Sequence, residues 1–388
     1  MKIALVISSL GGGGAERVMA TLANAWLQDG AEVTLITLAS RAEDVYPLDG
    51  AVGRVGLNLT GHSPSILRAL TRNIIRLRRL RAALVACKPG VVVSFMTTTN
   101  LLTILACRGL KCPVLVSERI FVSKHPPRGV WRLLYRPLYR LATEVVSQTE
   151  RGAADLEARL KRKVTVIHNP LTPAHPDSIQ RRVQAPPSLR KGGARWVLAI
   201  GRLSAEKGFD LLIDAFARVA SHHPLWRLVI AGEGPERAAL TAQITGVGLA
   251  ERIHLLGFCD DPQALLQQAD LFVLSSRYEG MPNALLEAMT AGCPCISFDC
   301  DSGPAEVIEH GVNGWLVARE DVAALARALE HLMQDSSESQ RLGVAAKAVS
   351  DRFGIKVVIA QWNSLIASAI EKRNFGEARP ESKRVTTP

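Results

Sequence analysis

Short apolar runs alternate with helical segments along almost the whole of this 388-residue chain. The runs at 3–9, 91–95 and 271–274 have the length of buried strands, and the segments between such runs carry apolar residues at helical spacing. Strands that alternate with helices predict parallel, doubly wound sheets. The alternation stops in the stretch 171–194, which is rich in Pro, Ser, Gln and Arg and predicts a linker.

The alternation and its interruption predict an α/β chain with two Rossmann-like domains. We expect a first domain at 1–170, a linker at 171–194 and a second domain at 195–353. A last helix is predicted at 355–372, and the polar tail 374–388 is expected to be disordered.

Charge is divided unevenly between the two halves. Residues 1–194 carry 28 Lys and Arg against 12 Asp and Glu, whereas residues 195–388 carry 19 against 24. An anionic surface or substrate is therefore expected to approach the first half.

Cysteine usage and hydropathy indicate in which cellular compartment the protein is expected. The seven cysteines are odd in number and scattered through apolar contexts, which favours reduced thiols in a cytosol. Cys293 and Cys295 have no second Cys/His pair at ligand spacing, so we expect no metal. No apolar run approaches the roughly 18 residues that span a bilayer, and the start of the chain lacks a signal-peptide pattern.

The stretch 275–292 joins a strand end to a helix start. Backbone amides at a helix N-terminus attract phosphate, and the residues expected there are Gly280, Met281, Pro282 and Asn283. Glu279 and Glu287 lie about two turns apart and need separate tasks. A carboxylate suits a vicinal diol, so we predict that Glu287 holds a ribose and Glu279 a sugar. The alternative is a helix cap and a solvated helix residue.

Two further loops can bind phosphate. Arg202 and Lys207, in GRLSAEKG (201–208), leave a strand end and can converge on a diphosphate, or else pair with Glu206 or Asp210. Gly13 and Gly14 belong to a glycine loop before a helix, where backbone can approach a ligand, or form a plain tight turn.

The glycine loop does not indicate a dehydrogenase or a P-loop enzyme. Glu16 stands where a dinucleotide fingerprint has its third glycine, and no acid closes the second strand. A G-K-[ST] sequence is also missing from the chain.

The segment 66–87 predicts an amphipathic helix. The predicted apolar face holds Leu67, Leu70, Ile74, Leu77 and Leu84, and the predicted opposite face holds Arg68, Arg72, Arg76 and Arg79. No acid occurs between Asp49 and Glu118, so these arginines favour phosphates of a membrane surface or a pyrophosphate lipid. A solvated face is the alternative. Nucleic acid is disfavoured because no aromatics are interleaved.

Two more features of the first half are candidates. Glu118 and Arg119 follow a strand, at the sheet edge where open α/β folds bind ligands. The basic segment 124–142 has Trp131, Tyr135 and Tyr139 four residues apart, which predicts either a membrane-interface stripe or part of the core.

These motifs resemble one enzyme family over nearly the whole chain, to about residue 372. E-G-x-P-x-x-x-x-E at 279–287, followed by A-G-x-P, resembles the E-x7-E signature of retaining glycosyltransferases of family 4, which have the GT-B fold. G-R-x-x-x-x-K-G at 201–208 is also similar. S-F-x-x-T-T-N at 94–100 and the arginine helix resemble bacterial enzymes that extend undecaprenyl-pyrophosphate-linked oligosaccharides with GalNAc or a related hexose.

The resemblance implies a hexosyl transfer from a UDP-sugar, with the anomeric configuration retained and without a metal or cofactor. It implies two domains that face across a cleft, with the last helix packed back on the first. Arg202, Lys207 and Glu279 are then catalytic. The donor-binding set is Gly13, Gly14, Glu233, Gly257, Gly280, Met281, Pro282, Asn283 and Glu287.

The acceptor implied is a polyprenyl-pyrophosphate-linked or other glycan at the inner face of the cytoplasmic membrane. The acceptor-binding set is Glu16, Arg68, Arg72, Arg76, Arg79, Glu118 and Arg119. Many family members carry a His near Arg119, which leaves the sugar contact there open. Asp299 and Asp301 spell D-x-D, but that metal motif belongs to a different fold.

Two other functions fit parts of the pattern. A nucleotide-sugar epimerase can share this architecture and needs no acceptor. A non-catalytic basic adaptor for acidic lipid or RNA would not bind UDP. The donor sugar, the acceptor hydroxyl, the number of additions and the oligomeric state do not follow from the sequence.

Overall fold

The chain divides into two compact units. The computed structural model describes residues 1–388 except 61–65, 125, 128, 172–191, 260–261 and 378–388, with only the backbone of 66–70 and 375–377. Unit 1 comprises Met1–Gln148, Gly152–Pro170 and the chain from Ile355 onward, and unit 2 comprises Thr149–Arg151 and Leu171–Gly354. Most of the predicted linker and tail lies outside the described residues.

Unit 1 is built on a seven-stranded sheet of order β3-β2-β1-β4-β5-β6-β7, in which every pair is parallel. The strands are β1 (Lys2–Ile7), β2 (Glu32–Thr37), β3 (Gly53–Gly56), β4 (Val91–Phe95), β5 (Val114–Glu118), β6 (Glu144–Ser147) and β7 (Thr165–Val166). β1, β4 and β5 are buried along almost their whole length and are mostly apolar, because helices cover both faces of the sheet.

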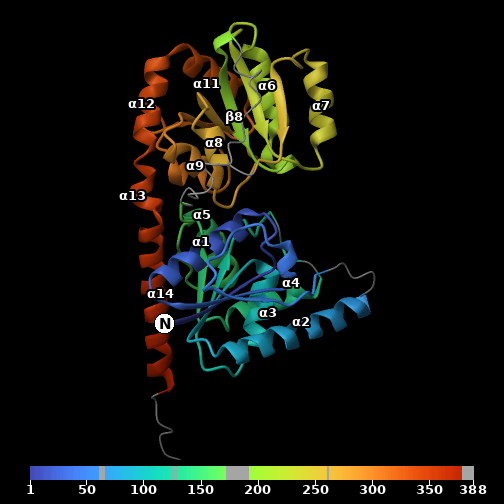
Figure 1. The fold of residues 1–388 in the computed structure, drawn as a ribbon, viewed down its shortest axis with the longest axis vertical. Helices are drawn as coiled ribbons and strands as arrows, with labels where there is room; N and C mark the ends of the chain where they lie inside the picture. The colour runs from blue at the N-terminus through green and yellow to red at the C-terminus, as the bar shows by residue number, and fades with distance from the viewer. Residues whose placement is uncertain (61–65, 125, 128, 172–191, 260–261, 378–388) are drawn as a thin grey trace, which may run out of the picture. The chain divides into compact units, whose positions relative to one another are not determined.

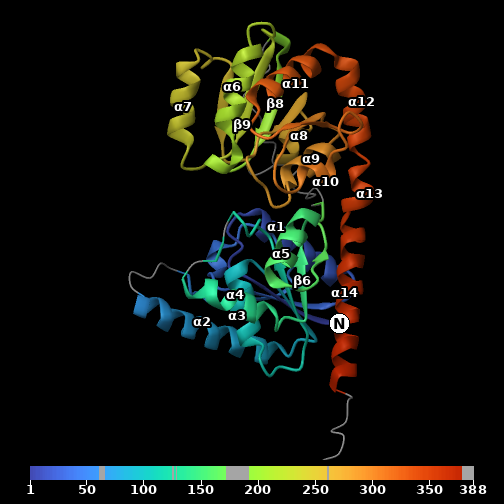
Figure 2. The same ribbon diagram turned by 180° about the vertical axis from the view of Figure 1, so that it is seen from behind.

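Helices cover the sheet of unit 1 (Figures 1 and 2). They are α1 (Gly14–Gln28), α2 (Ile66–Cys87), α3 (Thr97–Ala106), α4 (Val130–Tyr139), α5 (Glu150–Leu160) and α14 (Ile355–Glu377). One apolar core joins the sheet to α1 and α14, and a second core, on the other face, joins it to α2, α3, α4 and α5.

Unit 2 has a six-stranded parallel sheet of order β10-β9-β8-β11-β12-β13. The strands are β8 (Arg195–Ile200), β9 (Trp226–Ala231), β10 (Ile253–Gly257), β11 (Leu271–Leu274), β12 (Cys295–Asp299) and β13 (Trp315–Ala318). The predicted pair of doubly wound parallel sheets is therefore confirmed.

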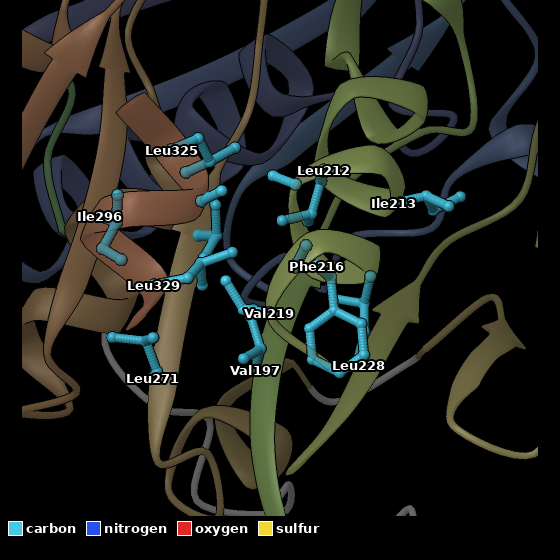
Figure 3. Close-up of a cluster of buried hydrophobic side chains, with 14 of the residues drawn as sticks. Val197, Leu212, Ile213, Phe216, Val219, Leu228, Leu271, Ile296, Leu325 and Leu329 are labelled. Carbon is cyan, nitrogen blue, oxygen red and sulfur yellow. The ribbon is translucent and has the colours of Figure 1, made fainter. Parts of the chain in front are cut away.

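Helices also cover both faces of the sheet of unit 2. They are α6 (Phe209–Val219), α7 (Arg237–Gly246), α8 (Pro262–Leu266), α9 (Asn283–Thr290), α10 (Pro304–Val307), α11 (Val322–Gln334), α12 (Ser336–Ala346) and α13 (Val349–Phe353). Figure 3 shows the larger core, where Leu212 and Phe216 of α6 meet Leu325 and Leu329 of α11 over the strands.

The last helix, α14, returns to unit 1. Trp362 packs edge-on against Trp26, and the indole N–H of Trp26 donates to the Asn363 amide oxygen at 2.8 Å. One helical stretch of the described chain, Ser336–Asn374, is long and apolar enough to cross a membrane by length and composition. Its apolar residues Val358, Trp362 and Ile366 are buried in the core of unit 1.

Helix α2 differs from the predicted amphipathic pattern. Leu80 and Leu84 are fully buried, with Leu77 packed against the same core, whereas Ile74 is 43% exposed. Arg76, which the spacing places opposite the apolar face, is half-buried, and its Nε donates to the Leu59 carbonyl at 3.0 Å. Ile74 was therefore wrongly placed on the buried face. Among the α2 side chains that the structure describes, those that pack on the core begin at Leu77, and the side chains of Leu67 and Leu70 lie outside the described residues.

Candidate active site

The candidate donor residues of unit 2 lie where the strand order reverses. β8 neighbours β9 on one side and β11 on the other, so the connections after β8 and β11 leave the sheet in opposite directions. Open parallel sheets bind ligands beyond the carboxyl ends of their strands at such a switch point. The loop 201–208 follows β8, and the loop 275–282 follows β11.

Glycines let these strand-end loops interlock. A Cβ at Gly208, whose φ is 61°, would lie 2.1 Å from the Ser275 carbonyl oxygen, and one at Gly234 would lie 2.3 Å from the Leu203 carbonyl oxygen. Only glycine allows such an approach of two backbones. The Ser275 hydroxyl also donates to the Lys207 carbonyl at 3.0 Å, so the loops after β8 and β11 form one structure.

An ion pair joins these two loops. Lys207 Nζ lies 2.7 Å from Glu279 Oε1, and the Ser276 hydroxyl donates to the same oxygen at 2.6 Å. Burial alone would lower the pKa of Lys207, but the Glu279 carboxylate outweighs it and the net pKa is raised. The lysine is therefore a fixed positive charge at the switch point.

Arg202 differs from Lys207 in its surroundings. Its side chain is exposed, and within the part of the chain that the structure describes it has no hydrogen-bond or ion-pair partner. A guanidinium with unused N–H groups, on the same loop as the Lys207 ammonium, can bind the oxygens of a diphosphate.

Helix α9 begins at the same edge. Its N-cap is Pro282, with no side-chain cap, and the Asn283 amide donates to the Met281 carbonyl at 3.0 Å. Glu287 is buried inside the helix rather than solvated. The Gly280 carbonyl accepts a hydrogen bond from the Ser302 hydroxyl at 3.1 Å, which ties this turn to the loop after β12.

The loops after β9 and β10 lie on the other side of β8. Glu233 is exposed and pairs with Arg237 at 2.9 Å. Gly257 has a φ of 84°, and a Cβ there would lie 3.0 Å from Glu233 Oε1. The Gly257 carbonyl accepts from the Gly232 amide at 2.8 Å, so both loops are joined at the sheet edge.

The glycine loop of unit 1 also lies at a switch point, since β1 stands between β2 and β4. Helix α1 begins at Gly14 with Gly13 as its N-cap and no side-chain cap. Burial raises the pKa of Glu16 against a hydrogen bond from Ser9, 3.5 Å away. A Cβ at Gly13 would lie 2.2 Å from the Glu16 carboxylate, which is the end of a flexible side chain and can move aside.

Glu118 is fully buried at the end of β5. Its oxygens accept from the Tyr139 hydroxyl and from the Thr97 hydroxyl, the latter at 2.7 Å. Burial raises the pKa of Glu118 to about 7, against the effect of these hydrogen bonds. The carboxylate therefore holds α3 and α4 to the sheet edge, and its part in acceptor binding stays a prediction.

Arg119 is buried over the Phe95 ring, with its guanidinium carbon 3.6 Å from the ring centroid. One nitrogen, Nη1, donates to the Asn169 side chain at 2.5 Å, while Nε and Nη2 have no partner among the described residues. Burial lowers the pKa of this arginine to about 9. The two unused N–H groups form the side of the guanidinium that binds a carboxylate or phosphate in pairs.

The arginines of α2 are not equivalent. Arg72 and Arg79 are exposed, and Arg76 is bound to the Leu59 carbonyl. The side chain of Arg68 lies outside the described residues. Arg81, which was not a candidate, donates to the Ala106 and Arg108 carbonyls, both at 2.7 Å, and so caps the end of α3.

The sequence did not reveal the partners within the site. The sequence assigns Lys207 to a diphosphate and Glu279 to a sugar and does not predict that they pair. It offers Asp210 as a partner for Lys207, whereas in the structure Asp210 pairs with Arg277 at 2.6 Å. These partners lie about 70 residues apart, and no local spacing signals them. Among the described residues, no three His, Cys, Asp or Glu are placed to hold a metal ion. The expectation of a metal-free reaction stays a prediction.

Comparisons with known proteins fit this geometry. The family model for Glycosyltransferase Family 4 matches residues 12–175, and the model for Glycosyl transferases group 1 matches residues 180–349. The crystal structure of the Anabaena protein HepE in complex with UDP-glucose has a TM-score of 0.75 to this chain at 21% identity, covering 95% of this chain and 100% of that one. Two parallel-sheet units with these neighbours define a glycosyltransferase of the GT-B fold.

Two relatives from Campylobacter jejuni match almost the whole chain. The GalNAc-alpha-(1->4)-GalNAc-alpha-(1->3)-diNAcBac-PP-undecaprenol alpha-1,4-N-acetyl-D-galactosaminyltransferase is 30% identical over 370 residues, 95% of this chain and 98% of that one. The N-acetylgalactosamine-N,N'-diacetylbacillosaminyl-diphospho-undecaprenol 4-alpha-N-acetylgalactosaminyltransferase is 26% identical over 372 residues, 93% of this chain and 97% of that one. This chain belongs to glycosyltransferase family 4, as its motifs predicted.

Proposed function

We propose that this glycosyltransferase moves a hexosyl unit from a UDP-sugar to a lipid-linked oligosaccharide or cell-surface polysaccharide precursor, with retention of the anomeric configuration. The names of both Campylobacter relatives specify undecaprenyl-diphosphate-linked acceptors, and HepE was crystallised with UDP-glucose. The observation that carries the donor part is the Lys207–Glu279 pair with the exposed Arg202 at the switch point of unit 2.

The leaving diphosphate gains negative charge as the glycosidic bond breaks. Lys207, kept protonated by Glu279, and Arg202 stabilise that charge without reorganising during the reaction. The start of α9, at Gly280 to Asn283, supports the same phosphates. Glu279 orients the donor sugar and Glu287 the ribose. Gly13, Gly14, Glu233 and Gly257 complete the donor contacts in this proposal.

The acceptor is assigned to unit 1. The exposed arginines Arg72 and Arg79, together with Arg68 and Arg76 on the same helix, attract the pyrophosphate of a lipid carrier. Glu118 and Arg119 lie at the end of β5, and Glu16 lies in the first turn of α1. All three are proposed to contact the acceptor glycan. We place the enzyme on the inner face of the cytoplasmic membrane, because the acceptors named for both Campylobacter relatives are attached to a membrane lipid.

A mass measurement tests this function. The protein is incubated with a panel of UDP-sugars and undecaprenyl-pyrophosphate-linked oligosaccharide, and the product is weighed. We expect one donor to add a hexosyl mass to the glycolipid, and Arg202→Ala to lower turnover by two or more orders of magnitude, about 3 kcal/mol. Arg218→Ala, an exposed arginine at the far end of α6, is the matched control.

The same assay separates the alternatives. Conversion of a UDP-sugar without any acceptor would indicate an epimerase instead. Near-normal turnover of Arg202→Ala would remove that residue from the mechanism.

A further inference from the structure

Helix α4 carries a solvent-facing surface that the donor and acceptor sites do not use. Its aromatic stripe is core: Tyr135 and Tyr139 are buried with ring centroids 4.4 Å apart, and Trp131 packs beside them. The exposed side instead holds large aliphatic residues. Leu133 is 78% exposed, and Val130 and Leu141 are each about half exposed.

The exposed side of α4, together with the turn at Arg140 and Leu141 that follows it, divides into two parallel rows. The apolar row has spacings of three or four residues and consists of Val130, Leu133, Pro137 and Leu141. Leu134, four residues after Val130, belongs to the same row. Arg132, Arg136 and Arg140 are each four apart and form the neighbouring row. An apolar row flanked by a basic row is the pattern of a helix that lies in the plane of a membrane interface.

Charge favours an anionic membrane over another partner. No Asp or Glu occurs between Glu118 and Glu144 in the sequence. Within the described part of the chain, none of the three arginines is paired with a carboxylate. Each unpaired arginine near an anionic lipid surface contributes attraction, while the leucines enter the acyl boundary.

A cavity of about 550 Å³ adjoins the basic row. Arg132 and Arg159 line it, and so does Tyr135, whose buried hydroxyl has no partner among the described residues. Arg159 also holds Asp155 and Ser123, so it is less available than Arg132. A lipid phosphate that enters this cavity would meet the Arg132 guanidinium, whereas the Tyr135 hydroxyl itself is buried.

A second helix of the same layer carries a similar set of exposed residues. α2 and α4 both pack against α3 on one face of the unit 1 sheet (Figure 2). On α2, Ile74 and Ile75 are 43% and 47% exposed beside the exposed Arg72. This repeats the combination of exposed aliphatic side chains and arginine.

We propose that the outer face of α4 docks the enzyme on an anionic phospholipid surface, with Leu133 and Leu141 inserted and Arg132, Arg136 and Arg140 on the headgroups. The proposal rests on the proposed function in that a lipid-linked acceptor resides in such a membrane. It names the docking surface, which the acceptor assignment does not.

Vesicle flotation tests the docking. The full chain is floated with vesicles of phosphatidylcholine alone or with an equal part of phosphatidylglycerol. We expect binding only with phosphatidylglycerol, and weaker binding at high salt. Leu133→Asp with Leu141→Asp should weaken it by at least about tenfold. Replacing the three arginines by Gln should cost about fivefold for each, whereas replacing them by Lys should retain most binding.

Controls separate docking from folding and catalysis. Leu225→Asp with Val344→Asp changes two exposed aliphatic residues of unit 2 and should leave vesicle binding unchanged. UDP binding and melting temperature are measured on every variant, so failure of the donor site is visible separately. Equal flotation with both vesicle types, or unchanged binding of the Leu133/Leu141 variant, would overturn the proposal. The proposal would also be overturned if the wild-type chain bound no vesicles but formed a dimer that substitutions in α4 dissociate.

Discussion

Lys207 and Glu279 neutralise each other's charge at the edge of the unit 2 sheet. The Lys207 side chain is 23% exposed and that of Glu279 is 10% exposed, so either charge alone would be poorly solvated. Their pairing keeps a cation in place before any substrate arrives. In electrostatic catalysis such a preset charge needs no reorganisation as the leaving group departs.

Lys207→Met should therefore lower both turnover and stability. The variant leaves Glu279 without its partner, at a cost of roughly 3 kcal/mol in the free energy of unfolding. Lys207→Met with Glu279→Gln should lose less stability than Lys207→Met alone, yet remain inactive. Denaturant unfolding and single-turnover assays measure both effects. Equal stability of wild type and Lys207→Met would mean that the pair does not hold the loops.

Glu118 makes the stability of unit 1 depend on pH. Its pKa is about 7 in the folded chain against an ordinary value of 4.5. Between these pH values the folded chain holds a proton that the unfolded chain has released. Stability is thus lost as pH rises from 4.5 to 7, by on the order of 3 kcal/mol.

Glu118→Gln should remove this pH dependence. The amide stays neutral, so the free energy of unfolding of the variant should change much less between about pH 5 and about pH 8 than that of wild type. Urea unfolding at the two pH values measures it. The raised pKa of Glu118 would be contradicted if wild type became more stable from the lower to the higher pH while Glu118→Gln did not.

At the scale of elements, the donor site depends on backbone contacts between loops. Gly208→Ala would force a Cβ to 2.1 Å from the Ser275 carbonyl oxygen at a φ of 61°. We expect a loss of more than about 2 kcal/mol in stability, together with weaker UDP binding. Gly246→Ala is the control: Gly246 is at the end of α7, and a Cβ added there would have no atom within 4 Å. This substitution should be neutral or slightly stabilising. An unaffected Gly208→Ala would show that the loops are not held this way.

Elements were predictable where the local pattern is strong. The strands 91–95 and 271–274 and the loops that follow them could be placed because parallel sheets demand apolar runs with turn residues at their ends. β3 (Gly53–Gly56) was missed, since G-R-V-G has two glycines and one aliphatic residue, and its pairing with β2 supplies what the sequence does not signal.

Side-chain partners were less predictable than elements. Helical spacing alone put Ile74 on the buried face of α2, but burial depends on whether a neighbour reaches that end of the helix. Lys207 and Glu279 meet because β8 and β11 are adjacent in the sheet, which is a property of topology. The contact between Lys207 and Glu279 can be predicted only when the order of the strands in the sheet is known.

At the scale of the whole molecule, α14 completes a unit whose other elements end at Pro170. Trp362 contributes a fully buried side chain between Trp26 and Phe95. Lys372 and Arg373 extend the contact, the latter donating to the Cys112 carbonyl at 2.6 Å. The first domain is therefore discontinuous in sequence.

Trp362→Ala should destabilise unit 1 by about 3 to 5 kcal/mol, because it leaves a cavity in the core. Val357→Ala, at an exposed position of the same helix, should cost less than about 1 kcal/mol. Thermal unfolding of both variants measures the difference. Similar melting temperatures would show that α14 is not part of the core.

The central claim is that a nucleoside diphosphate binds unit 2 at Arg202, Lys207 and the start of α9. Titration calorimetry of UDP against wild type, Arg202→Ala, Lys207→Ala and the control Arg218→Ala tests it most directly. The account predicts that each of the first two variants loses about tenfold or more in affinity, while the control binds like wild type. UDP affinity that is equal in all four proteins would contradict it.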